Sequence, residues 1–379
     1  SNLAFIDTSL VYGTNDVSLS VARNGVAFAD VAVSDNQRDV AAALGSAAAP
    51  ASLNSAITSM DRASAQAAFD SLSGEIHAST ASVLLEDSRY LRNTVNDRMR
   101  QGDCGNGDPR SVLAPTSGLQ STSSGCQGQG VGWITALGGW ATHDGGSGVA
   151  SVDRDLSGFM LGFDNNLNDE WRAGIAAGYT KTSLDANKRN SDASVDSYHL
   201  ATYLSYQLDA FAARMGAGYS WHDIDTKRHV AVGNYNEELK AKYKAGSAQV
   251  FGEVGYTIEA AGVALEPFAG IAYVNYDSDT GREKGGAGAL EASSKQDATF
   301  TTVGLRAGKQ FVLGNGTTLT PRGSLGWRHA FGDTQPDADL RFVDGGAAFS
   351  TQGVPLAKDA AVIEAGLDVS VGAAGKLGV

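Results

Sequence analysis

The residues of this chain that could carry out chemistry are few and scattered. Its six histidines stand far apart, at His77, His143, His199, His222, His229 and His329. The sequence contains no Gly-x-Ser-x-Gly, HExxH or phosphate-loop pattern and no Ser-His-Asp spacing. We therefore expect no hydrolase centre, no metal site and no cofactor in these 379 residues.

The two cysteines, Cys104 and Cys126, bracket a segment rich in Gly, Ser and Pro, with no histidine nearby. A zinc site needs more ligands than this pair supplies, so a disulfide in an oxidising compartment fits better. Closing this loop would stabilise the fold by about 3 kcal/mol in the chain-entropy description.

The stretch from Glu75 to Arg100 contains neither Gly nor Pro and consists mainly of helix formers. As a helix it would span roughly 39 Å, comparable with a bilayer including its headgroups. It cannot face lipid, because it carries Glu86, Asp87, Arg89, Arg92, Asp97, Arg98 and Arg100. Taken alone, it is typical of a solvated surface helix; a membrane would require a polar lumen around it.

The composition is 42% hydrophobic and 19% charged, with 47 Gly and 7 Pro, which favours β-structure over disorder. No apolar run reaches the roughly 18 residues of a membrane helix, but barrel strands show only alternation. A net charge of −13 and the lack of a basic stripe argue against nucleic acid as a partner.

From residue 131 onward, alternating segments recur, most of them close to the roughly 9 to 11 residues of a barrel strand. They cover 133–142, 156–164, 171–182, 194–208, 211–223, 245–258, 263–276, 298–312, 317–331 and 360–371, and a last one opens at Lys376. Short connections alternate with long polar ones, the latter at 143–154, 183–193, 224–244, 277–297 and 332–359. Sorting of connections by length is typical of an outer-membrane barrel and not of a soluble sandwich.

One face of these segments is apolar and the other is small or charged. In 317–331, Leu325 and Trp327 alternate with Ser324 and Arg328. If the charged face points inward, the lumen displays Glu253, Glu266, Arg306, Arg322 and Glu364.

We expect arginines of the 75–100 helix to pair with lumenal acids, because unpaired charges in such a lumen are costly. The arginines are Arg89, Arg92 and Arg98, and the acids are Glu253, Glu266 and Glu364.

Upstream, alternation over 5–33 predicts three strands, with turns at 13–16 and 24–25. Such a small set cannot bury a core alone. An Ala-rich stretch over 36–71 is helical in pattern and is broken at Pro50. The start at Ser1 shows no signal peptide, so we expect a fragment of a longer precursor.

Several runs, taken in order, resemble the translocator domain of type Va autotransporters: AAFDSLSGEIHAS, LLEDSRYLRNTVNDRMR, GWITALGGW, LEPFAGIAYV and VIEAGLDVSVG. A further run, NDVSLSVARNGVAFADVAVSDNQRDVAAAL, resembles the end of a subtilase-type passenger. The resemblance implies an all-β transmembrane fold, an antiparallel twelve-stranded barrel with a lumenal α-helix. Since the chain stops at Val379, before the family's last strand, we expect ten full strands and a stub.

The resemblance divides the chain into four parts. They are the end of a passenger at 1–50, a helical spacer and pore-spanning helix at 51–103, a linker at 104–130, and a barrel, incomplete at its C-terminus, at 131–379. The expected disulfide would lie on the periplasmic side.

The function implied is export of an N-terminal passenger to the cell surface by type V secretion, from the outer membrane of a Gram-negative bacterium. Partners would be membrane lipid, the passenger, the barrel-assembly machinery and periplasmic chaperones. A porin-like or adhesin-like barrel is the alternative. Hydrolase activity would lie in a passenger upstream.

In some family members an Asn of the lumenal helix cleaves the chain by attacking its own main-chain carbonyl. The run RNTVNDRM places Asn93-Thr94 at that bond. The hypothesis assigns proton uptake to Glu253 or Glu266, and orientation of the carbonyl to Arg306 or Arg322.

Overall fold

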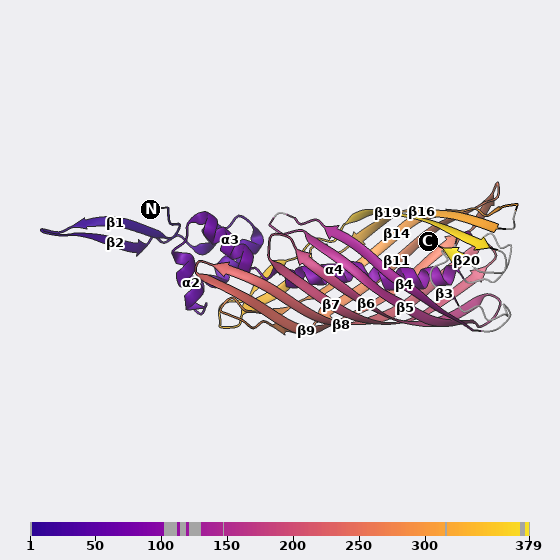
Figure 1. The fold of residues 1–379 in the computed structure, drawn as a ribbon, viewed down its shortest axis with the longest axis horizontal. Helices are drawn as coiled ribbons and strands as arrows, with labels where there is room; N and C mark the ends of the chain where they lie inside the picture. The colour runs from indigo at the N-terminus through magenta and orange to yellow at the C-terminus, as the bar shows by residue number, and fades with distance from the viewer. Residues whose placement is uncertain are drawn as a thin grey trace.

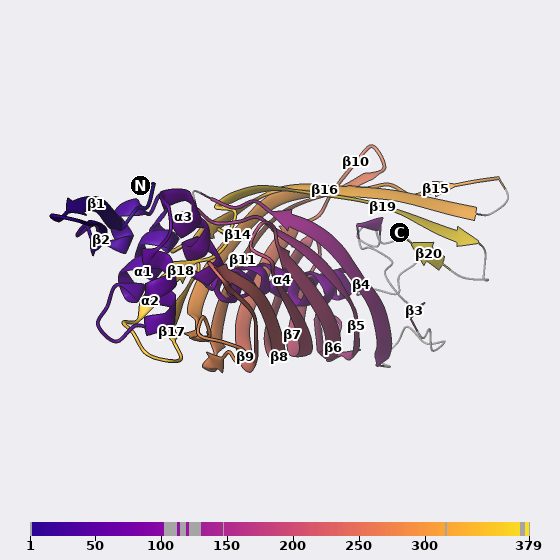
Figure 2. The same cartoon turned by 60° about the vertical axis from the view of Figure 1, so that its left-hand side comes forward.

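The structure, a computed structural model, describes residues 2–101, 112–113, 119–120, 130–146, 148–314, 317–371 and 376–378. Its largest feature is one antiparallel sheet with the strand order β20-β19-β16-β14-β11-β9-β8-β7-β6-β5-β4-β3. The sheet curls around α4 (Glu75–Arg100), which runs along the inside of the barrel (Figure 1 and Figure 2). Cys104 and Cys126 lie outside the described residues.

The strands follow one another in chain order around the barrel. The long ones are β4 Val131–His143, β5 Val152–Asn166, β6 Trp171–Ala186, β7 Ser191–Leu208, β8 Phe211–Val232, β9 Tyr235–Tyr256, β11 Val263–Ser278, β14 Lys295–Gly308, β16 Thr317–Phe331 and β19 Asp359–Val371. The short ones are β3 Leu119–Gln120, β10 Ile258–Ala260, β15 Phe311–Val312 and β20 Lys376–Gly378. The predicted antiparallel barrel is confirmed, and among the described residues it has ten long strands and a short strand that begins at Lys376.

Within the apolar belt, each long strand turns its apolar face outward, as the alternation predicted. Ile175, Leu325 and Trp327 are at least half exposed, whereas Thr180 and Arg328 on the opposite face are buried. An outer belt of apolar side chains around a polar interior is the surface that a bilayer requires.

The predicted loops at 183–193 and 224–244 are wrong in large part. β6 and β7 stay paired up to Ala186 and Ser191, and β8 and β9 up to Val232 and Tyr235. The outward side chains of these extensions are charged because they lie beyond the apolar belt and face water. Their charge density gave these strands the composition of a loop.

The segment before α4 forms a hairpin and a group of helices. The hairpin is β1 Ile6–Tyr12 and β2 Val17–Arg23; a 3-10 helix, η1 Phe28–Val31, stands where a third strand was predicted. The helices are α1 Asp35–Leu44, α2 Ala51–Thr58 and α3 Arg62–Leu72, with the expected break at Pro50. The side chains of Ser34 and Asp61 accept hydrogen bonds from the first turns of α1 and α3.

Two barrel loops also contain strands and complete what we call the outer cap. β12 Gly281–Arg282, β13 Leu290–Ser293, β17 Asp337–Phe342 and β18 Phe349–Gln352 form a four-stranded sheet. Together with η1 and α1–α3 they enclose one apolar core, which includes Phe69, Leu72, Val230 and Leu340. The helices lie at one end of the barrel, beside the start of α4 (Figure 1).

The cap core takes side chains from before α4 and from the barrel loops after it, so neither part can bury its apolar face alone. Within the described part of the chain, none of the helices is both long enough and apolar enough to cross a bilayer.

Candidate functional site

The lumen filled by α4 is the candidate site. α4 starts after Gly74, whose φ of 68° is left-handed. A Cβ at Gly74 would come within 2.6 Å of Leu290 and 2.9 Å of Leu340, so this tight junction favours glycine. The residues from Glu75 to Asp87 are all buried. The helix therefore begins under the outer cap and continues inside the barrel wall.

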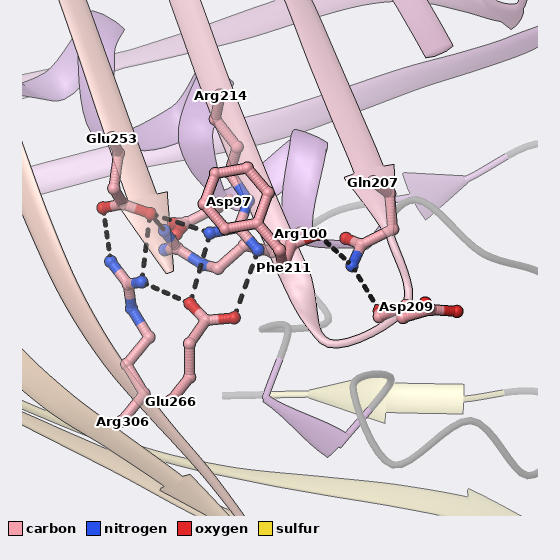
Figure 3. A network of polar contacts seen from close by, with 9 residues as sticks. All are labelled: Asp97, Arg100, Gln207, Asp209, Phe211, Arg214, Glu253, Glu266 and Arg306. Atoms are coloured by element: carbon pink, nitrogen blue, oxygen red, sulfur yellow. Dashed lines mark hydrogen bonds and ion pairs between the residues drawn. The ribbon is translucent and has the colours of Figure 1, made fainter. Parts of the chain in front are cut away.

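Near the C-terminal end of α4, six charged side chains form what we call the inner charge cluster (Figure 3). They are Asp97, Arg100, Arg214, Glu253, Glu266 and Arg306. Glu253 accepts hydrogen bonds from Arg214 at 3.0 Å, from Arg306 at 2.6 and 3.0 Å, and from Arg100 at 3.4 Å. Glu266 accepts from Arg306 at 2.7 Å and from Arg214 at 3.2 Å.

Strand register creates the inner charge cluster. Arg214 of β8 stands directly opposite Glu253 of β9, and Glu266 of β11 stands opposite Arg306 of β14. Opposite charges at facing positions stabilise a pair of strands. Three guanidinium groups meet three carboxylates, because Arg100 of α4 also pairs with Asp97 of its own helix. The cluster is balanced in charge, which buried ions require.

Arg98 contacts the barrel wall at a different carboxylate from those predicted. Its Nε and Nη2 donate to the two oxygens of Asp164 at 2.6 and 2.9 Å. Asp164 also accepts from the hydroxyl of Tyr203 at 2.8 Å. Trp133 donates in turn to Tyr203 at 2.9 Å. This bidentate pair fixes the rotation of the last turns of α4.

Arg89 and Arg92 also differ from the pairing expected for them. Arg89 lies 3.9 Å from Glu86 of its own helix, and Arg92 donates to the neutral amide of Gln249 at 3.2 Å. Arg328 of β16 donates to both oxygens of Glu86 at 2.9 Å. We call Arg89, Arg92, Arg328 and Glu86 the middle arginine group.

The remaining lumenal residues named from the sequence lie on β16 and β19. Glu364 accepts a hydrogen bond from Ser324 at 2.9 Å and lines the lumenal cavity. Arg322 pairs with Asp368 across the same two strands. Neither Glu364 nor Glu266 is bonded to the arginines of α4 that were expected to reach it.

Asn93 lines a lumenal cavity of about 270 Å³ together with Glu253, Arg306 and Glu364. Its side chain is exposed to that cavity, whereas the neighbouring Thr94 is buried. Asp97 stands one helical turn further along the same face. The structure thus brings Asn93 into the same space as two of the groups proposed to act on it. Glu266 is held beside that space by Arg214 and Arg306.

The outer end of α4 has a buried polar network that sequence reasoning missed, the outer ion network. Arg228 of β8 binds Glu283 through two hydrogen bonds of 2.7 Å, and His77 of α4 lies 2.9 Å from Glu283. The second ring nitrogen of His77 lies 3.2 Å from the hydroxyl of Tyr243. Burial alone would raise the pKa of Glu283, but Arg228 and His77 hold that pKa well below its ordinary value.

A second contact of the outer ion network involves Glu75. Arg189, at the tip between β6 and β7, lies 3.1 Å from Glu75 and 3.4 Å from Asp70. Burial raises the pKa of Glu75 in spite of Arg189. Glu283 comes from the predicted loop at 277–297, and Arg189 comes from the tip between β6 and β7. No spacing in the sequence connects either residue to α4.

Comparison with known proteins gives consistent matches. The autotransporter β-domain family matches residues 132–379. Two extracellular serine proteases of Serratia marcescens are 33% and 32% identical to this chain over 410 aligned positions, which cover 97% of it. The chain spans 38% of the length of each of these relatives.

Among solved structures, the translocator domain of the autotransporter NalP from Neisseria meningitidis has a TM-score of 0.55 and 16% identity, covering 80% of this chain and 89% of that one. At this level of identity the likeness concerns the fold.

Proposed function

The chain belongs to the autotransporter β-domain family, outer-membrane barrels that export a passenger, and from that premise we propose how its parts divide the work. The barrel at 131–379 is the translocator. α4 remains in the lumen after export as a plug, and residues 1–50 are the end of the exported passenger. The proposal that α4 is a plug rests on its continuous burial from Glu75 to Asp87 inside the barrel wall.

The plug is supported by contacts along the whole helix. Arg98 binds Asp164 of the wall near one end, and His77 binds Glu283 near the other. Between them Arg328 binds Glu86. A helix held at three levels blocks the pore and cannot slide without breaking buried polar contacts, of which each arginine–carboxylate pair costs about 3 to 5 kcal/mol to break from one side.

Conductance in planar bilayers tests the plug. The full chain should pass a small current, and deletion of the residues before Asn106 should increase it. Deletion of the β1–β2 hairpin alone, residues 6–23, is the matched control, because it leaves α4 and the outer cap in place. A large steady current from the full chain would favour a porin, and an unchanged current after the longer deletion would refute the plug.

Assembly of the barrel by the barrel-assembly machinery and periplasmic chaperones belongs to the same proposal. It is supported by the long apolar strand faces, such as those of β6 and β16, which must be kept from aggregating on the way to the membrane. Depletion of the assembly machinery should leave the chain protease-sensitive in the periplasm. The protease activity named for the Serratia relatives would lie in the part of those proteins that this chain does not span.

Release of the passenger by the chain itself is a second candidate function. It is supported by the exposure of Asn93 to the cavity that contains Glu253 and Arg306. The side-chain amide nitrogen would attack the Asn93 carbonyl carbon, the bond to Thr94 nitrogen would break, and the amide proton would pass to that leaving nitrogen through a nearby carboxylate. Glu253, which lines this cavity, binds three arginines, and Asp97, one helical turn from Asn93, pairs with Arg100; both carboxylates are candidate proton acceptors.

The precursor carrying Asn93→Ala tests this second function. Retention of the passenger by this variant, with release in wild type, would support self-cleavage. Asn96→Ala is the matched control on the same helix, and it should release normally. Release at the wild-type rate from Asn93→Ala would end the proposal.

A further inference from the structure

The middle arginine group differs from the other ion clusters of the lumen in its charge balance. It contains three guanidinium groups, those of Arg89, Arg92 and Arg328, and one carboxylate, that of Glu86. The neighbouring acid, Asp87, faces away and pairs with Arg154 at 3.3 Å. Among the described residues, the group therefore carries a surplus of two positive charges.

The surplus lies in a confined place. The side chain of Arg328 is 10% exposed, and its Nε has no hydrogen-bond partner within the described part of the chain. Arg92 and Arg328 both approach the ring of Phe300, at 5.9 and 5.3 Å from its centre. The aromatic ring holds both guanidinium groups in place and shields them from water on one side.

The three arginines open onto the lumenal cavity of about 270 Å³. Two carboxylates also line this cavity, and their partners differ. Glu253 is bound by Arg100, Arg214 and Arg306, whereas Glu364 accepts from the neutral hydroxyl of Ser324 and therefore offsets one of the two surplus charges, which leaves one positive charge for an anion. A volume of this size accommodates a small anion with some of its water.

We propose that the middle arginine group is a binding site for a small inorganic anion, either chloride or hydrogen phosphate. Unpaired buried charges are costly, and guanidinium groups favour anions that accept several hydrogen bonds. Arg92 contributes the most available charge, because its one hydrogen bond within the described ranges goes to a neutral amide. The anion would supply the negative charge that the wall lacks at this level of α4.

Thermal unfolding of the full chain in detergent tests the site. Chloride or phosphate is titrated against gluconate, a bulky anion, at constant ionic strength. For wild type we expect the midpoint to stay constant below the dissociation constant and then to rise with the logarithm of the anion concentration, by roughly 5 °C at about 100 times that constant. Chloride and phosphate are separate arms, and a rise in one arm identifies the anion.

Two substitutions decide whether the effect arises at this site. Arg92→Gln removes one of the three guanidinium charges of the group and should abolish the rise. Arg98→Gln on the same helix is the matched control; it lowers the midpoint by breaking the pair with Asp164 but should keep the anion dependence. Glu86→Gln increases the surplus and should make the rise begin at a lower anion concentration.

A wild-type midpoint that does not depend on either anion would overturn the proposal. An anion dependence that survives in Arg92→Gln would overturn it as well, since the effect would then arise elsewhere on the surface.

Discussion

At its outer end α4 enters an apolar core shared with loops of the barrel, whereas at its inner end it is held by charged side chains of the barrel wall. Phe69 and Leu72, just before α4, pack with Val230 and Leu340 in the outer cap. Arg98 and Arg100, in the last turn, bind Asp164 and Glu253. The outer end contains buried ion pairs too, but there they lie beneath a larger apolar contact.

The difference follows from what surrounds each end. Outside the membrane the loops are free to build a core of their own, and apolar burial is non-directional, so the cap depends on volume and area. Inside the barrel the outward face of every strand is taken by lipid-facing side chains, and the inward face combines charged residues with an apolar cluster smaller than the cap core, in which Val95 and Met99 of α4 lie with Phe251. The inner contacts therefore depend more on direction and charge pairing than those of the cap. Each end should respond to a different perturbation.

The largest effect is expected from removing apolar volume at the outer end. Phe69→Ala deletes a fully buried ring and should cost about 4 kcal/mol. Limited proteolysis should then cleave α1–α3 while the barrel keeps its heat-modifiable mobility on gels. Tyr12→Ala, at a site that is 73% exposed, is the control. Equal protease resistance of Phe69→Ala and wild type would contradict a shared cap core.

Removing charge at the inner end should have a somewhat smaller effect. Arg98→Ala leaves Asp164 buried without its bidentate partner and should cost about 3 kcal/mol. We expect the inner end of α4 to become accessible, measured as a higher conductance of the barrel, while the cap stays protease-resistant. Arg98→Lys keeps the charge but loses the bidentate geometry, so the conductance of this variant should lie between those of wild type and Arg98→Ala. Cap proteolysis in Arg98→Ala would mean that the ends are not separable.

Acidification should have two opposing effects on the stability of the outer end. The pKa of Glu283 is lowered by its partners, so its stabilisation is present above about pH 4.5 and is lost as pH falls through the lower folded value. The pKa of Glu75 is raised by burial, so its protonation on acidification favours the folded cap.

Hydrogen exchange of α1–α3 between pH 7 and pH 3, corrected for intrinsic rates, measures this balance. Glu283→Gln should lose less hydrogen-exchange protection than wild type as the pH falls, and Glu75→Gln should lose more. Identical profiles in the two variants would show that these carboxylates do not set the pH response of the cap.

The smallest effect is expected on the exposed hairpin extension. Asp225 and Lys242 are 2.8 Å apart but mostly exposed, so Asp225→Asn should change the unfolding free energy by less than about 1 kcal/mol. Chemical denaturation in detergent measures this change in unfolding free energy. A larger change would mean that the hairpin extension stabilises the cap as strongly as the buried ion pairs do.

The barrel was predictable from the sequence because its information is local. Alternation with a period of two assigned Leu325 and Trp327 to the outside and Arg328 to the lumen. Over Ile224 to Arg228 the alternation is reversed, with Asp225 outward and Ile224 buried, so a strand extension was interpreted as a loop. The outer cap could not be predicted, since its core joins Phe69 with Leu340, which are far apart in the chain.

The sequence by itself determined that α4 is a charged helix and that the wall offers it Glu253, Glu266 and Arg306. Only the tertiary structure decided which charges meet. Strand register set Arg214 opposite Glu253, and the depth and rotation of α4 directed Arg98 to Asp164 and left Arg92 beside a neutral amide. Alternation is fixed between neighbours along a strand, whereas depth and rotation depend on every contact of the helix at once, so no local pattern encodes them.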